Sequence, residues 1–134
     1  MKELARIETV IHLQRVDLFT ACDAEQIVRI SGIARQQRFQ PGESLFQANS
    51  PADALHCIVT GKVEVTDADG SQSFVEPPGT LGVIEILSGR LRSDSATASE
   101  ETLVLALDAE DFFDLLANNV EIVRSLFRQL LREQ

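Results

Sequence analysis

Between residues 35 and 107, turn-favouring residues cut the chain into short strand-like pieces. The pieces read RQQRF, ESLF, LHCIVT, KVEVTD and QSFV, separated by Pro41-Gly42, Asn49-Ser50-Pro51, Gly61 and Asp69-Gly70. KVEVTD alternates apolar and polar residues, as a half-buried strand does, and Asp-Gly between two strands predicts a two-residue hairpin turn. Short strands separated by turns about every 8–12 residues favour a sandwich, barrel or jelly roll.

Helical patterns precede this β region. Leu4, Ile7, Val10 and Ile11 recur at helical spacing, with charged residues between them. Asp23 opens a second helix, with Gln26 at the spacing of a capping box. The residues that this second helix is expected to bury are Ile27, Ile30 and one of Val28 and Ile33.

Two further helices follow the last apolar strand, TLVLAL. Asp108 is expected to cap the first of them, and Asn118-Asn119 to end it. The final helix carries an apolar stripe made of Val123, Leu126, Phe127, Leu130 and Leu131. This stripe is too wide for a helix that rests only in water, so we expect it to pair with a second copy or to dock on a larger parent protein. The alternative is that the whole stripe folds back onto the domain.

The 134 residues fit one domain. We expect a mainly β fold, an antiparallel β-roll (jelly roll) with N-terminal helices in residues 2–34, strands over about 35–107 and C-terminal helices over about 109–132. No apolar run approaches the roughly 18 residues that span a bilayer, and the first residues lack the apolar stretch of a secretory signal. The expectation is a cytoplasmic protein, or the cytosolic part of a larger one, without membrane insertion by this segment.

Composition narrows the function classes. The formal net charge of −9 opposes contact with nucleic acid backbones, so we expect no direct nucleic acid binding. The two cysteines are far apart, and Cys57 in its apolar strand is expected to be a buried, reduced thiol. His12 and His56 are too few for a multi-histidine metal site, and no metal or other cofactor is expected.

One loop stands out against this acidic background. The segment LGVIEILSGRLRSDSATA, residues 81–98, places Arg90 and Arg92 among glycines and hydroxyl groups. A guanidinium stays charged and donates hydrogen bonds in a fork that matches phosphate oxygens. From the residues alone, Arg92 is either an anion ligand or a partner in an internal ion pair with Asp94 or Glu85. Arg90 is interpreted as a solvated surface charge.

From about residue 10 onward, the order of the expected elements resembles the cyclic nucleotide-binding domain family. This order is two helices, a β-roll with a Gly/Arg loop before its last strand, and two closing helices. The segments VDLFTACDAEQIVRI and RFQPGESLFQANSPADALHCIVTGKVEV are similar to the first half of the family pattern. The family has glycine where this chain has Asn49. Because asparagine also tolerates a left-handed backbone, the resemblance implies that this turn survives.

The resemblance places the Gly/Arg loop on the phosphate-binding cassette of the family. It implies that Gly82 lets the backbone approach the sugar-phosphate, that Gly89 forms the turn before the arginine, and that Arg92 pairs with the cyclic phosphate. Ser93 falls where some members offer a hydroxyl and an amide to the phosphate. The candidate binding residues are Gly82, Val83, Ile84, Glu85, Arg92, Ser93 and Asp94, and the candidate ligand is cAMP or cGMP.

Three cassette positions depart from the family pattern. Val83 replaces the glutamate that holds the ribose hydroxyl, Leu91 replaces a proline, and Asp94 replaces a small residue close to the expected phosphate. Glu85 lies two positions beyond Val83 and is a candidate to reach back toward the ligand. We therefore expect a non-catalytic regulatory or sensor domain with a degenerate cassette, in which cAMP or cGMP binding is weak or absent.

Two other functions are considered. One is a structural or oligomerisation module of a larger protein, with no ligand. The other is a cupin-like enzyme, since cupins also use jelly rolls, but that chemistry needs clustered histidines with a carboxylate. His56 is the one histidine in the β region, so the sequence favours a protein that is not an enzyme.

Overall fold

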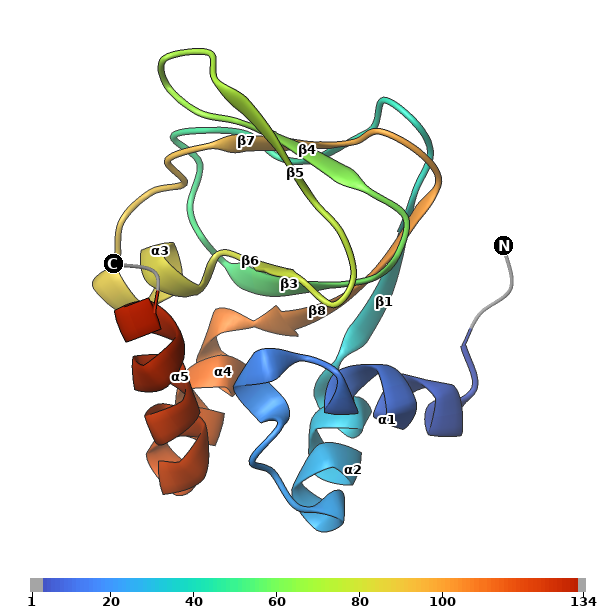
Figure 1. Ribbon diagram of the computed structural model, residues 1–134, viewed down its shortest axis with the longest axis vertical. Coiled ribbons are helices and arrows are strands. Elements are labelled where there is room, and N and C mark those ends of the chain that lie inside the picture. Colours follow the sequence, from blue (N-terminus) through green and yellow to red (C-terminus); the bar gives the residue numbers. More distant parts are fainter. Residues whose placement is uncertain (1–3, 133–134) are drawn as a thin grey trace.

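The computed structural model describes residues 4–132, in which a roll of eight strands stands on helices from both ends of the chain (Figure 1). The N-terminal helices are α1 (Arg6–Gln14), the 3-10 helix η1 (Asp17–Phe19) and α2 (Ala24–Ile33). The strands are β1 (Arg35–Phe39), β2 (Ser44–Phe46), β3 (Ala54–Thr60), β4 (Val63–Thr66), β5 (Gln72–Val75), β6 (Thr80–Leu81), β7 (Ser95–Ala98) and β8 (Thr102–Asp108). The other helices are α3 (Val83–Ser88), α4 (Ala109–Asn118) and α5 (Val120–Arg132).

The strands form two four-stranded antiparallel sheets, with the orders β1-β8-β3-β6 and β2-β7-β4-β5. This confirms the predicted antiparallel β-roll with flanking helices, and each quoted strand-like piece contains a strand. The β4–β5 hairpin is present, but its loop is longer than the predicted two residues. The last ladder pair is Thr66 with Gln72, Asp67 then bonds to Ser71, and Gly70 adopts a φ of 87°.

The N-terminal helices correct the predicted packing. The capping box is confirmed, because the Asp23 carboxylate accepts from the Gln26 N–H and the Gln26 side chain accepts from the Asp23 N–H. The four apolar residues at helical spacing divide: Leu4 and Val10 pack against the core, whereas Ile7 and Ile11 are exposed, and Thr9 and Leu13 are buried. In α2, Ile27 and Ile30 are buried as predicted, whereas Val28 and Ile33 are both exposed. Each helix contacts the core along one narrow face, and the remaining apolar residues fall outside it.

Two apolar clusters share strand β3. Leu55, Cys57 and Val59 join the larger cluster, which the helices also enter, and Ile58 on the other side of the strand joins a small cluster inside the roll with Val63, Val65 and Ala96. Alternate residues of a strand point to opposite sides, so one strand connects both clusters. Cys57 is confirmed as a buried free cysteine, and burial raises the pKa of its thiol to about 12.

At the C-terminal end, Asp108 precedes α4 as predicted, but its carboxylate makes no cap bond and accepts from Arg35 Nη2 at 2.6 Å instead. Asn119 ends α4, as expected from the Asn pair.

The predicted apolar stripe of α5 is partly buried and partly exposed. Leu126 is buried and Val123 and Leu130 are half-buried, but Phe127 and Leu131 remain 59% and 66% exposed. Within residues 4–132, no helix combines the length and the apolar character that a membrane span requires.

Candidate ligand-binding site

The predicted cassette begins with a short helix bounded by two glycines. Gly82 precedes α3 with a φ of 103°, and Gly89 follows it with a φ of 70°. Both values lie in the left-handed region that glycine adopts without strain. The chain can therefore turn sharply from β6 into α3 and again from α3 toward Arg92.

The backbone of Arg92 is anchored to the turn that follows β2. The Asn49 N–H donates to the Arg92 carbonyl at 2.7 Å, and the Arg92 N–H donates to the Ser50 carbonyl at 2.8 Å. Asn49 has a φ of 69°, which confirms that asparagine supplies the left-handed turn at the family's glycine position. The cassette is thereby held against the β2–β3 connection, from which the partners of the Arg92 side chain also come.

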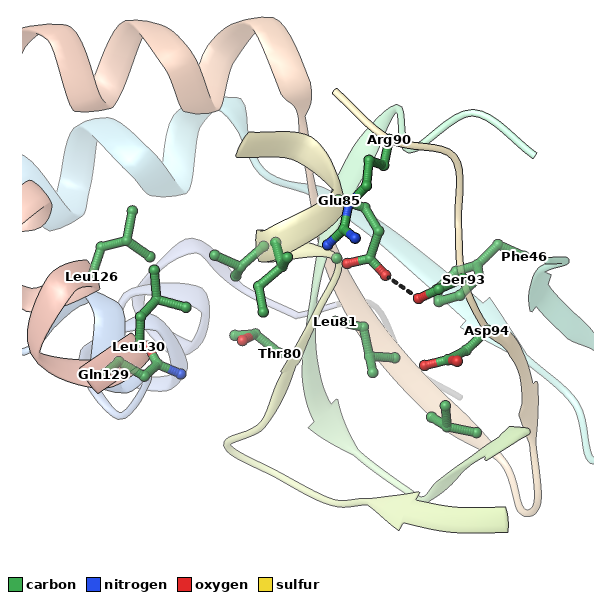
Figure 2. A pocket seen from close by; sticks show the side chains of 14 residues that line it. Phe46, Thr80, Leu81, Glu85, Arg90, Ser93, Asp94, Leu126, Gln129 and Leu130 are labelled. Carbon is green, nitrogen blue, oxygen red and sulfur yellow. Dashed lines mark hydrogen bonds between the residues drawn. The ribbon is translucent and has the colours of Figure 1, made fainter. Parts of the chain in front are cut away.

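A cavity of about 330 Å³ opens between α3, the start of β7 and α5 (Figure 2). Six of the seven candidate residues line it, namely Gly82, Val83, Ile84, Glu85, Ser93 and Asp94. The remaining lining residues are Phe46, Val65, Thr80, Leu81, Arg90, Leu126, Gln129 and Leu130. The cassette and the last helix, which are far apart in the sequence, thus enclose one space.

Arg92 is the candidate residue that does not line the cavity. Its side chain is only 1% exposed and points into the protein, where Nη2 donates to the Ala54 carbonyl at 2.8 Å. Its Cζ lies 4.0 Å from the centre of the Phe46 ring, a cation–π contact. The ion pairs predicted with Asp94 or Glu85 are wrong, because the carboxylate that the structure pairs with Arg92 is that of Asp53, at 3.9 Å. The loop folds the guanidinium toward the β2–β3 connection, which supplies the Ala54 carbonyl and the Asp53 carboxylate.

Two nitrogens of this guanidinium, Nε and Nη1, are buried without a hydrogen-bond partner. Burial lowers the pKa of Arg92, while Asp53 and Glu85 oppose this effect, and arginine still stays protonated at neutral pH. A Cβ atom at Gly82 would lie 2.5 Å from Nη1, so only glycine fits over the guanidinium at this point. The positive charge therefore lies directly behind a backbone segment that lines the cavity.

The other cassette side chains bring negative charge to the cavity. The Glu85 carboxylate lines the cavity and accepts the Ser93 hydroxyl at 3.1 Å (Figure 2). Asp94 lines the same cavity, and burial together with the charges of Glu85 and Asp67 raises the pKa of Asp94. Val83 contributes no carboxylate. The hydroxyl expected to face a phosphate is thus engaged by Glu85 in this structure.

Several lining residues were not candidate site residues in the sequence. Phe46 and Gln129 carry no motif, and they reach the cavity only because β2 and α5 lie next to the cassette in the fold. Arg90 was interpreted as a surface charge, and it is exposed but also lines the cavity, where its Nε donates to the Ser88 hydroxyl. In the sequence, the one signal for a role of Arg90 in the site was its position two residues before Arg92. Residues that close together in an irregular loop often lie near the same site.

His56 lies inside the roll and has no metal-ligand neighbours. Its ring is 5% exposed and packs 5.6 Å from the Phe46 ring, centre to centre. Burial and the charge of Arg92 lower the pKa of His56 to about 4, so the ring is neutral at neutral pH. Across residues 4–132, no three His, Cys, Asp or Glu side chains group closely enough to hold a metal ion.

The fold and the cassette define a β-roll domain with a cavity beside a buried arginine. A sequence model described as "Cyclic nucleotide-binding domain" matches residues 36–119, more than half of the chain. The chain belongs to the cyclic nucleotide-binding domain family.

Similar proteins agree with this assignment. The chain is 26% identical over 125 residues to a CRP-like cAMP-activated global transcriptional regulator of Mycobacterium tuberculosis, a match that covers 90% of this chain and 56% of the relative. Among solved structures, the N-terminal domain of a transcriptional regulator from Streptomyces coelicolor matches with a TM-score of 0.74, 28% identity and 90% of each chain covered. The Thermus thermophilus catabolite activator protein matches with a TM-score of 0.77 and 25% identity over 87% of this chain and 57% of that one.

Proposed function

We propose that this chain is a non-catalytic regulatory domain whose cavity binds a small phosphate-bearing ligand of the cyclic nucleotide class, with weak affinity for cAMP and cGMP. The observation that carries the proposal is the buried guanidinium of Arg92, with Nε and Nη1 unpartnered behind Gly82. Buried charged donors without partners are rare in folded proteins, and a phosphate oxygen is the acceptor that a guanidinium fits best. Cyclic nucleotides act as intracellular signals, so the proposed function implies a cytoplasmic location.

The weak affinity follows from the side chains that line the cavity. A hydrogen bond to a charged group contributes about 1.5–3 kcal/mol, so a valine at the position of the ribose-binding glutamate costs roughly ten- to hundred-fold in affinity. Asp94 adds repulsion, on the order of 4 kcal/mol if its carboxylate lies about 4 Å from the phosphate in a medium of effective dielectric near 20. Glu85 already lines the cavity and can hold a ribose hydroxyl if it releases Ser93.

Helix α5 is the element that would pass on a binding signal. Leu126, Gln129 and Leu130 form one wall of the cavity, so a ligand of nucleotide size must contact or displace this helix. The chain spans 56% of the length of its curated bacterial relative, which that protein's name describes as a cAMP-activated regulator. We therefore propose that α5 relays occupancy of the cavity to another part of a parent protein or to a second copy.

The exposed side of α5 supports a docking role. Phe127 and Leu131 lie on the same helix as the cavity-lining residues but face away from the core. Large apolar side chains that stay exposed together are typical of interaction surfaces. We propose self-association or docking to a parent segment through these two residues. If no ligand binds, the structural module considered above becomes the better description of the chain.

Calorimetric titration with cAMP and cGMP tests the proposal. The double variant Val83→Glu with Asp94→Ala is expected to raise cAMP affinity at least about ten-fold, because it restores one charged hydrogen bond and removes one repulsion. Val83→Gln with Asp94→Ala is the matched control, which keeps the length of the new side chain but not its charge. If neither the wild-type chain nor the restored variant binds either nucleotide, the proposal is wrong.

A further inference from the structure

Four buried side-chain nitrogen or oxygen atoms have no hydrogen-bond partner in the described part of the chain, and three of them belong to neighbouring side chains inside the roll. They are Nδ1 of His56 and Nε and Nη1 of Arg92. An unpartnered buried polar atom costs free energy, so a group of them in one place calls for an acceptor that reaches all three. Family resemblance did not assign His56 any role.

Strand β3 brings the two side chains together. The Ala54 carbonyl holds Arg92 Nη2, and His56 follows two residues later, on the same side of the strand. The register of β3 with β6 also places His56 near Arg92. His56 pairs with Leu81, and the next residue, Gly82, covers Arg92 Nη1. The charge of Arg92 also acts on the His56 ring.

Phe46 connects this pair to the cavity. Its ring contacts the guanidinium at 4.0 Å and the imidazole at 5.6 Å, and the same ring lines the cavity wall (Figure 2). Phe46 is half-buried and is not itself held by a polar contact, since its side chain has no polar atom. One ring thus contacts both buried side chains and also forms part of the cavity wall.

The chemistry of the pair fits an oxyanion. Arg92 offers only N–H donors, and a neutral imidazole carries one N–H and one lone pair. In the tautomer with the proton on Nδ1, both side chains offer donors, and an oxygen with a negative charge can accept from both. With a pKa of about 4, His56 is uncharged at neutral pH and can donate from Nδ1 only in the tautomer that carries the proton there.

We propose that His56 is a second anion-binding residue of this cavity, whose Nδ1–H donates to the same phosphate group that Arg92 binds after the Phe46 ring moves aside. The inference rests on the proposed function, because it names a further contact for the ligand of the same cavity. The expected ligand is a phosphodiester such as a cyclic nucleotide, with inorganic phosphate as its smallest probe.

Imidazole ¹⁵N spectra of the full chain, titrated with cAMP and separately with inorganic phosphate, test this contact. The chain has two histidines, so His12 on α1, which does not line the cavity, serves as an internal control. We expect the Nδ1 signal of His56 to shift with occupancy and to show a scalar coupling to the phosphorus of the bound ligand, while His12 stays unchanged. His56→Phe is expected to weaken cAMP binding about ten- to hundred-fold, and His12→Phe to leave it unchanged.

The outcomes separate the two proposals. If cAMP binds in an Arg92-dependent manner but His56 shows no coupling to phosphorus, the His56 contact is wrong and the proposed function stands. If neither probe binds and the His56 signals do not move, both proposals are wrong. If His56→Phe fails to fold, the coupling measured on the wild-type chain still decides.

Discussion

At the scale of single residues, Arg92 carries a buried charge that has few contacts within the protein. It is the one Lys, Arg, Asp or Glu side chain that is buried among residues 4–132, and it contacts protein through the Ala54 carbonyl, the Phe46 ring and the more distant Asp53 carboxylate. A buried charge with a single hydrogen bond is costly to maintain, so these contacts explain where the side chain lies but not why arginine is present. The proposed ligand would supply the missing reason, as an acceptor for Nε and Nη1.

The two arginines of the cassette allow a matched comparison. Arg92→Ala is expected to abolish ligand binding and to lower the free energy of unfolding by about 1–3 kcal/mol, because it leaves the Ala54 carbonyl without its partner. Arg90→Ala is expected to change binding much less and stability hardly at all, since Arg90 is exposed. Calorimetry and urea unfolding measure both quantities. A loss of stability without any ligand for the wild-type chain would mark Arg92 as a purely structural residue.

His56 makes stability depend on pH. In the unfolded chain its pKa is near 6.5, and in the folded chain burial and Arg92 lower it to about 4. Between these values the unfolded state binds more protons, so stability is lost as the pH falls from about 6.5 toward 4. The loss attributable to His56 between pH 7 and pH 4.5 is expected to be about 2–3 kcal/mol.

Urea unfolding of the wild-type chain and of His56→Gln at both pH values isolates this effect. The variant keeps a polar side chain but does not titrate, so its stability should fall less on acidification. All other ionisable groups are the same in the two proteins, so their contributions cancel in the comparison. Equal losses in the two proteins would show that the imidazole charges freely in the folded state.

At the scale of elements, α5 has two faces with different tasks. Ile122 and Leu126 are buried in the larger core, and Leu126 also lines the cavity. Phe127 and Leu131 point outward, and they lie four residues apart, on one side of the helix. Under the proposed function, one face of the helix would contact the ligand and the other a partner.

The exposed face predicts self-association. Light scattering is expected to show a dimer for the wild-type chain and a monomer for Phe127→Glu with Leu131→Glu, because two charges would replace the apolar contact. Ile7→Glu is the matched control, since Ile7 is exposed to the same 66% as Leu131 but lies on α1. Circular dichroism should show equal helix content in all three. A monomeric wild-type chain contradicts self-association and leaves docking to a parent segment. Leu126 is unsuitable for this test because it is buried.

At the scale of the whole molecule, strand β3 joins the helical core to the interior of the roll. Alternate residues of β3 enter the two clusters, so both clusters depend on the same strand. From the sequence, we expect one domain over residues 1–134. Because both clusters share β3, we also expect the described part of the chain to unfold as one unit.

This cooperativity can be measured without tryptophan or tyrosine, both of which the chain lacks. Far-UV circular dichroism follows mainly the helices, and the imidazole signal of His56 follows the interior of the roll. The two urea transitions are expected to coincide. A His56 transition at clearly lower urea would show that the roll and the helices are separate folding units.

The sequence by itself determined six of the eight strands, the helices on either side of them and the position of the cassette, but not β6, β7 or α3. Turn residues and strand periodicity predicted every quoted strand, Asp23 and Gln26 predicted the start of α2, and the glycines and Arg92 marked the loop around which the cavity forms, because these signals act through local backbone preferences. Packing partners were not predictable in the same way. The sequence did not reveal that Ile7 and Phe127 stay exposed. Nor did it reveal that Arg92 turns toward Ala54 or that Phe46 contacts His56, since these contacts join residues distant in the sequence. Tertiary structure decided them, because a side chain's partners depend on which elements the whole chain brings together.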